Sequence, residues 1–136
     1  MNSLNRFKKK SGSPRDFRDL EAYQRAVIVR QDIWSFCKTL PTDEKYRLAD
    51  QMIRASRSAT ACIAEGYGRY HYQETIQFCR QARGSLYELL DHIVTTLECK
   101  YIVEEQAEAL LEKVRTTIKI LNGYIGYLRK RKENNA

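Results

Sequence analysis

Apolar residues recur at helical spacing along most of the chain. The clearest case lies between Glu104 and Lys130, where apolar positions alternate between spacings of four and three residues, as in a helix that packs along one seam. This apolar seam consists of Ala107, Leu111, Val114, Ile118, Leu121, Ile125 and Leu128. No stretch alternates apolar and polar residues with β-branched side chains, as a half-buried strand would. The pattern therefore predicts an all-α chain.

Proline, glycine and capping residues divide this pattern into four helices. The first must end before Pro41, because the residue before a proline resists the α conformation. Gly66 is expected to end the second helix in the left-handed conformation, and Gly84 to mark a close helix crossing. Short connections between long helices favour an antiparallel up-down-up-down four-helix bundle. The expected helices cover residues 16–39, Thr42 or Asp43 to Glu65, residues 73–98 and residues 104–130.

The first and last helices carry more apolar surface than a lone bundle buries. Residues 26–29 place apolar groups on every side of the first helix. A second apolar stripe follows the seam of the fourth, formed by Leu110, Thr117, Ile120, Tyr124 and Tyr127. A helix that is apolar nearly all round is buried nearly all round, so we expect a homo-oligomer; an unusually wide core stripe is the alternative. The candidate interface residues are Ile28, Trp34, Ile120, Tyr124 and Tyr127.

The net charge of +7 is concentrated at the two ends of the chain. Residues 1–15 hold five basic side chains and no acid, and residues 129–136 hold four against one, while residues 16–128 are nearly neutral. We therefore divide the chain into a basic N-terminal tail (1–15), a four-helix bundle (16–128) and a basic C-terminal tail (129–136). Such tails suit a polyanion, and solubility is the alternative explanation.

Arginines also align on two of the expected helices. Arg54 and Arg57 are three residues apart, as are Arg80 and Arg83, so each pair shares a helix face. A stripe across adjacent helices would follow a phosphate backbone, whereas salt bridges with nearby acids are the alternative. The candidate nucleic-acid-binding residues are Lys8, Lys9, Lys10, Arg54, Arg57, Arg69, Arg80, Arg83, Arg129, Lys130, Arg131 and Lys132.

The expected connection between the second and third helices is unusually aromatic. Residues 67–72 contain three tyrosines, one arginine and one histidine. Aromatic rings beside a cation can stack on unpaired bases while the cation meets phosphate. The alternative, which we favour at this point, is that the tyrosines cap the end of the bundle or pack against a neighbouring subunit.

Nothing in the sequence indicates catalysis or a metal. The four cysteines lie at least 17 residues apart, and neither histidine has a ligand partner close by, which favours buried thiols over disulfides or zinc. There is no glycine-rich phosphate loop and no legible nucleophile with its base, so we expect no enzyme, no cofactor and no metal. The longest uncharged apolar run is far too short for a membrane span, and no secretory signal is evident. We expect a cytoplasmic protein.

Short motifs in a fixed order point to a known family. They are Phe17-Arg-Asp-Leu20, Leu40-Pro41, Gln51-Met-Ile-Arg54-Ala-Ser-Arg-Ser58, Ile63-Ala-Glu-Gly66 with Arg69, and Ala82-Arg-Gly-Ser85 followed by Glu88-Leu89. Over residues 16–128 the chain resembles the four-helix-bundle family named for proteins encoded in intervening sequences of 23S ribosomal RNA genes. A related branch supplies the accessory variability protein of diversity-generating retroelements.

The resemblance implies an up-down bundle that assembles as a homopentamer, without known catalytic activity. For the retroelement branch it implies binding to nucleic acid and to a reverse transcriptase. Cys62 stands where many members have asparagine, so a polar role at that position is not carried over. We expect a non-enzymatic oligomer that binds RNA or DNA through backbone charge, with a reverse transcriptase as a further partner in that branch. The alternative is a protein-interaction scaffold that binds no nucleic acid.

Overall fold

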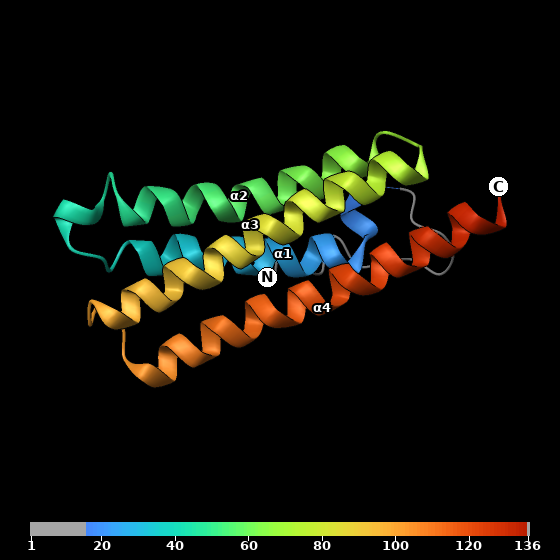
Figure 1. The fold of residues 1–136 in the computed structure, drawn as a ribbon. Helices are drawn as coiled ribbons and strands as arrows, with labels where there is room; N and C mark the ends of the chain where they lie inside the picture. The colour runs from blue at the N-terminus through green and yellow to red at the C-terminus, as the bar shows by residue number, and fades with distance from the viewer. Residues whose placement is uncertain (1–15, 136) are drawn as a thin grey trace.

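The computed structural model describes residues 16–135, which fold into four long helices and no strand (Figure 1). The expectation of an all-α chain is confirmed. The long helices are α1 (Glu21–Cys37), α2 (Leu48–Tyr67), α3 (Tyr72–Glu98) and α4 (Glu104–Asn134). Two short 3-10 turns, η2 (Phe17–Asp19) and η3 (Thr42–Glu44), precede α1 and α2.

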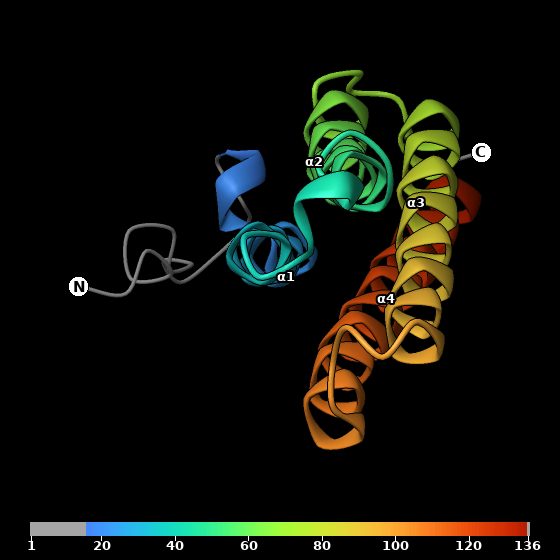
Figure 2. The ribbon, with the colours of Figure 1, turned by 90° about the vertical axis from the view of Figure 1, so that its left-hand side faces the viewer.

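The four helices lie lengthwise beside one another. Each packs on the next along the chain, and α1 also contacts α4. Figure 1 shows the α1–α2 and α3–α4 connections at one end of the molecule, and the α2–α3 connection at the other, where α4 also ends. The view turned by 90° places α1 and α3 on opposite sides, with α2 and α4 between them (Figure 2).

The core follows the seam expected on α4, because all seven seam residues are buried. Burying a side chain such as Leu121 stabilises the fold by roughly 1.5–3 kcal/mol. Leu110 and Thr117, from the second stripe of α4, are also buried, so the wide-core alternative explains that part of the apolar excess. Ile120 and Tyr124 are only half-buried, and Tyr127 is exposed.

Two helix starts differ from the expectation. Residues 16–20 do not continue α1, because the Asp16 carboxylate accepts a hydrogen bond from the Arg18 backbone N–H and Leu20 is extended, with φ −70° and ψ 128°. Similarly, α2 begins at Leu48 and not at Thr42. The intervening residues 42–47 are largely exposed, so no packed apolar face holds them in a long helix.

Two glycine expectations are wrong. Gly66 lies inside α2, outside the left-handed region, and a Cβ there would stand 2.7 Å from the Phe78 Cβ atom. Its carbonyl oxygen accepts a hydrogen bond from the Thr75 hydroxyl at 2.8 Å. Gly66 therefore permits the close approach of α2 and α3. In the α2–α3 connection the residue with left-handed φ is Tyr70, at 54°. The close crossing expected at Gly84 is absent, because nothing in the described chain lies within 4 Å of a Cβ there.

The expected C-terminal tail from residue 129 is helical as far as Asn134. Leu128 is buried at its start, and the Lys132 ammonium donates to the Gln73 side-chain carbonyl at 2.5 Å. Asn135 donates to the Tyr72 hydroxyl at 3.3 Å. These contacts hold the end of α4 against the start of α3, so the basic C-terminal residues belong to the bundle. The expected N-terminal tail lies outside the described residues.

Candidate nucleic-acid interface

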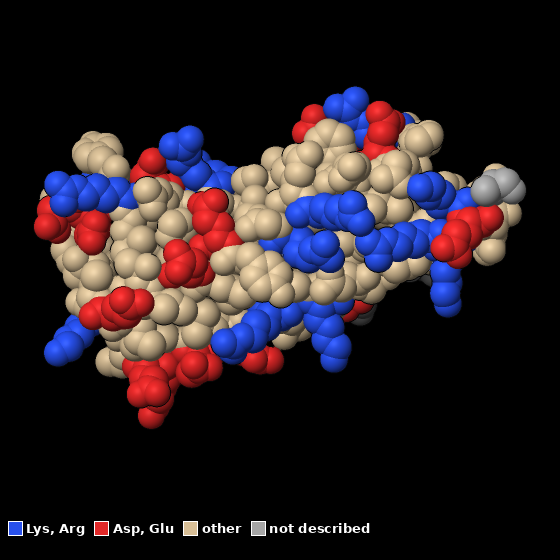
Figure 3. All heavy atoms as spheres, viewed as in Figure 1, with Lys and Arg blue, Asp and Glu red and all other residues tan. Residues whose placement is uncertain are grey.

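Charge separates along α3 and α4 into two regions of opposite sign. We call residues 72–85 and 116–134 the basic half and residues 86–115 the acidic half. The basic half holds seven Lys or Arg and two Glu, whereas the acidic half holds seven Asp or Glu and three Lys or Arg. Figure 3 shows Lys and Arg gathered where α3 begins and α4 ends, and Asp and Glu gathered at the other end of this face.

The cations of the basic half are not neutralised by carboxylates. They are Arg80, Arg83, Lys119, Arg129, Lys130, Arg131 and Lys132. None of them forms an ion pair with a carboxylate among residues 16–135. Arg83 donates to the Asn122 side-chain oxygen at 2.8 Å, and a hydrogen bond to Tyr72 raises the pKa of Arg131. Since these partners are neutral, they do not reduce the positive charge of this surface.

The arginines of α2 and of the α2–α3 connection have other surroundings. Arg54 pairs with Asp50 at 3.5 Å, and Arg69 pairs with Glu65 at 3.5 Å, so the salt-bridge alternative holds for both. The Arg57 guanidinium lies over the Trp34 ring of α1, with 5.5 Å between the guanidinium carbon and the ring centre. Arg83, in contrast, reaches α4. The expected common stripe of the α2 arginines with Arg80 and Arg83 is therefore not formed, because Arg57 faces α1 whereas Arg83 faces α4.

The expected basic residues Lys8, Lys9 and Lys10 lie outside the described residues. Of the other candidates, Arg80, Arg83, Arg129, Lys130, Arg131 and Lys132 lie together in the basic half. The proximity of the first two to the last four follows from the contacts between the end of α4 and the start of α3.

The aromatic connection divides into packed and free tyrosines. Tyr67 and Tyr72 are half-buried against the core, so capping of the bundle end accounts for them. Tyr70 is 87% exposed, and its ring centre lies 6.2 Å from that of Tyr67. Tyr70 is therefore the tyrosine of this connection that remains available for stacking.

The candidate interface residues occupy more than one surface. Ile28 lines a groove between α1 and α4, whereas Trp34 lines a groove between α1 and α2. Trp34 is 47% exposed and Tyr127 is 53% exposed. The Tyr127 ring stacks on that of Tyr124, with centres 6.3 Å apart, and burial raises the pKa of Tyr124. A single flat patch containing all the interface candidates is not present.

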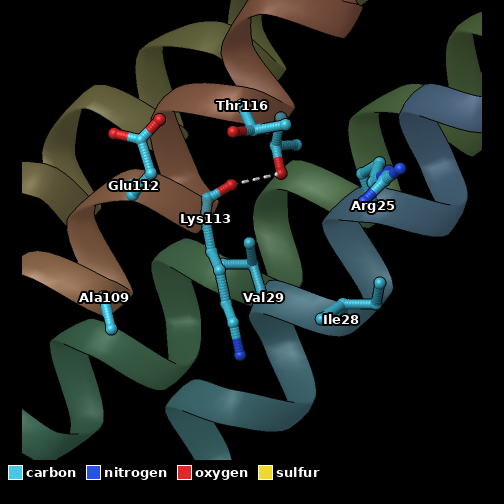
Figure 4. Close-up of a pocket in the computed structure, with 8 residues that line it drawn as sticks. Arg25, Ile28, Val29, Ala109, Glu112, Lys113 and Thr116 are labelled. Carbon is cyan, nitrogen blue, oxygen red and sulfur yellow. Dashed lines mark hydrogen bonds between the residues drawn. The ribbon is translucent and has the colours of Figure 1, made fainter. Parts of the chain in front are cut away.

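The α1–α4 groove encloses about 350 Å³ (Figure 4). Figure 4 shows Ile28 and Val29 of α1 facing Ala109 and Lys113 of α4. The Thr117 hydroxyl donates to the Lys113 carbonyl at 2.9 Å, and the Lys113 ammonium pairs with Asp32 at 2.6 Å. The Thr117 hydroxyl and the Lys113 ammonium are thus already bonded within the fold. The groove is therefore better suited to hold an apolar side chain than to catalyse a reaction.

Most of the sequence matches one known protein family. The model of the family described as 23S rRNA-intervening sequence protein matches residues 18–123. The chain belongs to this family. No curated protein matches the sequence.

A solved structure with the same fold supports the architecture of this family member. It is a protein of unknown function from the S23 ribosomal protein family of Bacteroides thetaiotaomicron, with a TM-score of 0.72 and 20% identity. The match covers 77% of this chain and 95% of the other. At that identity the likeness concerns the fold alone.

The thiols of this 23S rRNA-intervening sequence protein differ in their surroundings. Cys37 and Cys79 are buried, as expected, and burial raises their pKa values to about 11 and about 12. Cys62 is half-buried, and Cys99 is exposed, contrary to the expectation. Within residues 16–135, no cluster of three or more His, Cys, Asp or Glu could hold a metal. Across the same residues, no helix is both long and apolar enough to cross a membrane.

Sequence reasoning missed three cations of interest in this family member. Lys119 lies in the basic half, and Arg30 and Lys38 surround Trp34. The spacing of Arg30, Trp34 and Lys38 is four residues in each step, which places them on one helix face and could have identified the group.

Proposed function

We propose that this chain is a non-enzymatic helical bundle that binds the phosphate backbone of nucleic acid through its basic half. The observation that supports this function is the set of seven cations without a carboxylate partner in the described chain. Cations that already form ion pairs must lose a partner when they bind phosphate. Those of the basic half lose none, so their full charge is available to a polyanion.

Backbone recognition of this kind is largely independent of base sequence. Each phosphate contact releases condensed counterions, so the affinity falls steeply as the salt concentration rises. The bundle presents no described cleft in which bases of a duplex could be read individually. We therefore assign binding energy to charge and expect similar affinities for different sequences of the same length.

Assembly belongs to the same proposal. The positions of the connections in Figure 1 support an antiparallel up-down-up-down order, and exposed Tyr127 on α4 supports a homo-oligomer, for which the family resemblance implies a pentamer. An oligomer repeats the basic half in each copy, and linked contacts raise the overall affinity. The association with a reverse transcriptase, implied for the retroelement branch, stays a prediction.

The test compares two variants with the same change in net charge. One carries Arg80→Gln, Arg83→Gln, Arg129→Gln and Lys130→Gln in the basic half. The control carries Arg25→Gln, Arg54→Gln, Arg69→Gln and Arg115→Gln, whose arginines are ion-paired in the fold. Fluorescence anisotropy with labelled RNA and DNA of one length measures the affinity at several salt concentrations.

The basic-half variant should lose up to about 3.6 from the slope of log affinity against log salt on duplex DNA, because each phosphate contact contributes about 0.9. The control should keep most of the slope. Equal losses in both variants would show that only net charge matters. If the unaltered protein fails to bind at low salt, the scaffold function is favoured, with the α1–α4 groove as its candidate surface.

A further inference from the structure

A groove between α1 and α2 gathers three cations around the single tryptophan of the chain. It encloses about 360 Å³ and is lined by Arg30 and Trp34 from α1 and by Ile53 and Arg57 from α2. Lys38 lies at its edge, with its ammonium 5.4 Å from the centre of the Trp34 ring. The volume lies within the range of about 300–1,000 Å³ that is usual for small-molecule sites.

The three cations have no acidic partner in the described chain. Arg30 donates to the Thr60 hydroxyl at 2.9 Å, which orders its guanidinium without neutralising it. The Lys38 ammonium and the Arg57 guanidinium carbon lie 5.4 Å and 5.5 Å from the centre of the Trp34 ring, and 47% of Trp34 remains exposed. None of the three forms an ion pair within residues 16–135, and no described side chain that lines the groove is acidic. The groove therefore attracts an anion.

The exposed ring of Trp34 indicates which kind of anion the groove would bind. Trp34 is 47% exposed, and a large aromatic surface left in water favours contact with another flat ring. The Ser35 and Ser56 side chains add hydroxyl groups to the lining, and the Ser56 hydroxyl donates to the Ile53 carbonyl at 2.9 Å. A ligand with one flat ring and one negative group would meet both the tryptophan and the cations. A nucleotide has this combination.

We propose that the groove binds an unpaired nucleotide of single-stranded RNA or DNA, with phosphate at Arg30, Lys38 and Arg57 and the base against Trp34. This inference rests on the proposed binding of nucleic acid and names its class as single-stranded. The groove is separate from the basic half, because Arg57 faces α1 whereas Arg83 faces α4. In a duplex the bases are stacked within the helix and do not reach Trp34.

The single tryptophan gives a direct readout. Trp34 fluorescence is followed while the full chain is titrated with oligo(dT), oligo(U), a blunt DNA duplex of equal length, uridine monophosphate and inorganic phosphate. We expect saturable quenching by both single strands and little quenching by the duplex. The strands should saturate at lower concentration than the mononucleotide, because neighbouring phosphates add contacts. A mononucleotide that binds as tightly as the strands would overturn the assignment to a strand.

Variants separate the ring from the charges. Trp34→Leu should lower the affinity for oligo(dT), measured by anisotropy, about five- to hundred-fold, the range for loss of one base–aromatic contact, and should leave duplex affinity unchanged. Lys38→Gln with Arg57→Gln should reduce the single-strand salt slope by about 1.4. The matched control is Tyr46→Leu, since Tyr46 is 83% exposed and has Lys45 over its ring at 5.4 Å. This control should change neither affinity.

The outcomes distinguish this inference from the proposed function. If oligonucleotides bind through the basic half without quenching Trp34, the groove assignment is overturned and the proposed function stands. If quenching occurs but the basic-half variant binds normally, the groove assignment stands and binding through the basic half is overturned. If Trp34→Leu lowers the mass of the assembly in light scattering and leaves single-strand affinity unchanged, a second copy covers the groove and the inference is wrong.

Discussion

The basic and acidic halves of α3 and α4 share the same core and differ in their outer surfaces. Leu86 and Leu89 of α3 and Val114 of α4 are as deeply buried in the acidic half as Leu121 and Ile125 are in the basic half. Outside the core, two of the three cations in the acidic half, Lys113 and Arg115, pair with carboxylates, whereas none of the seven cations in the basic half does so within residues 16–135. Packing therefore does not determine the sign of the outer charges.

The difference separates cations that serve the fold from those available to a ligand. In the acidic half, Lys113 pairs with Asp32 at 2.6 Å, and Arg115 lies 3.6 Å from Glu108 and 3.8 Å from Glu112. Exposed pairs of this kind contribute at most about 1 kcal/mol. Arg129, Lys130, Arg131 and Lys132 repel one another and gain no such pairing with carboxylates. The C-terminal end of the α4 dipole favours positive charge at Arg131 and Lys132 in the last turn, which offsets part of this repulsion.

The largest contrast between the halves should appear in thiol reactivity. Cys79 is buried in the basic half, where burial raises its pKa to about 12, and Cys99 is exposed in the acidic half. At pH 8 iodoacetamide should label Cys99 at least about 1,000-fold faster, because the thiolate is the reactive form and must be reached by the reagent. Peptide mass spectrometry measures both rates. Comparable rates in the folded protein would show that the core opens readily at α3.

The same shift gives a pH dependence with a definite sign. The pKa of Cys79 rises from about 9 to about 12 on folding, so its contribution to stability is complete below about pH 9. That contribution is lost as the pH rises towards 12, because the unfolded thiol ionises first. Urea unfolding of Cys79→Ala should show a weaker decline over this range than unfolding of the unaltered chain.

Charge reversal tests whether position matters more than net charge. Arg80→Glu with Arg83→Glu should lower the affinity for nucleic acid about 100-fold at 0.1 M salt. Lys100→Glu with Arg115→Glu, which changes the net charge equally, should lower it less than about threefold, because salt screens charges beyond about 10 Å. Anisotropy measures both. Losses of similar size would break the distinction between the halves.

The smallest effects concern two glycines, Gly66 in α2 and Gly84 in the basic half of α3. Gly66→Ala should destabilise the fold by about 1–3 kcal/mol, because the new Cβ would stand 2.7 Å from the Phe78 Cβ atom. Gly84→Ala should stabilise it by up to about 1 kcal/mol, since the position is an exposed helix interior with nothing nearby. Urea unfolding of both variants measures the two signs. A stabilising Gly66→Ala would contradict the close packing of α2 on α3.

The sequence predicts the helices and the α4 core because a seam repeats over several turns, so each position supports the others. It does not distinguish the two uses of glycine, which is why Gly66 was expected in a left-handed turn and is found at a close crossing. Both a left-handed turn and a close crossing can place a glycine near a helix end. Which of the two applies to Gly66 depends on how closely α2 and α3 approach each other, and the local sequence does not show this.

The candidate site was predictable only where it depends on spacing along one helix. Arg80 and Arg83 are evident from their spacing, but their grouping with Arg129 and Lys130 requires that α4 continue past residue 130 and pack on the start of α3. The excess of positive charge in residues 129–136 predicts a basic tail, whereas the structure shows a continued helix. The contact of Arg57 with Trp34 depends on how α1 and α2 face each other, which no local pattern records.

Lysine footprinting tests the central claim most directly, because one experiment reads both halves. The full chain is acetylated briefly with and without saturating oligonucleotide, and mass spectrometry gives the protection of each lysine. Lys119, Lys130 and Lys132 should be protected, whereas Lys100 and Lys113 should react as in the free protein. Equal protection of both groups, or protection of Lys100 and Lys113 alone, would contradict binding through the basic half.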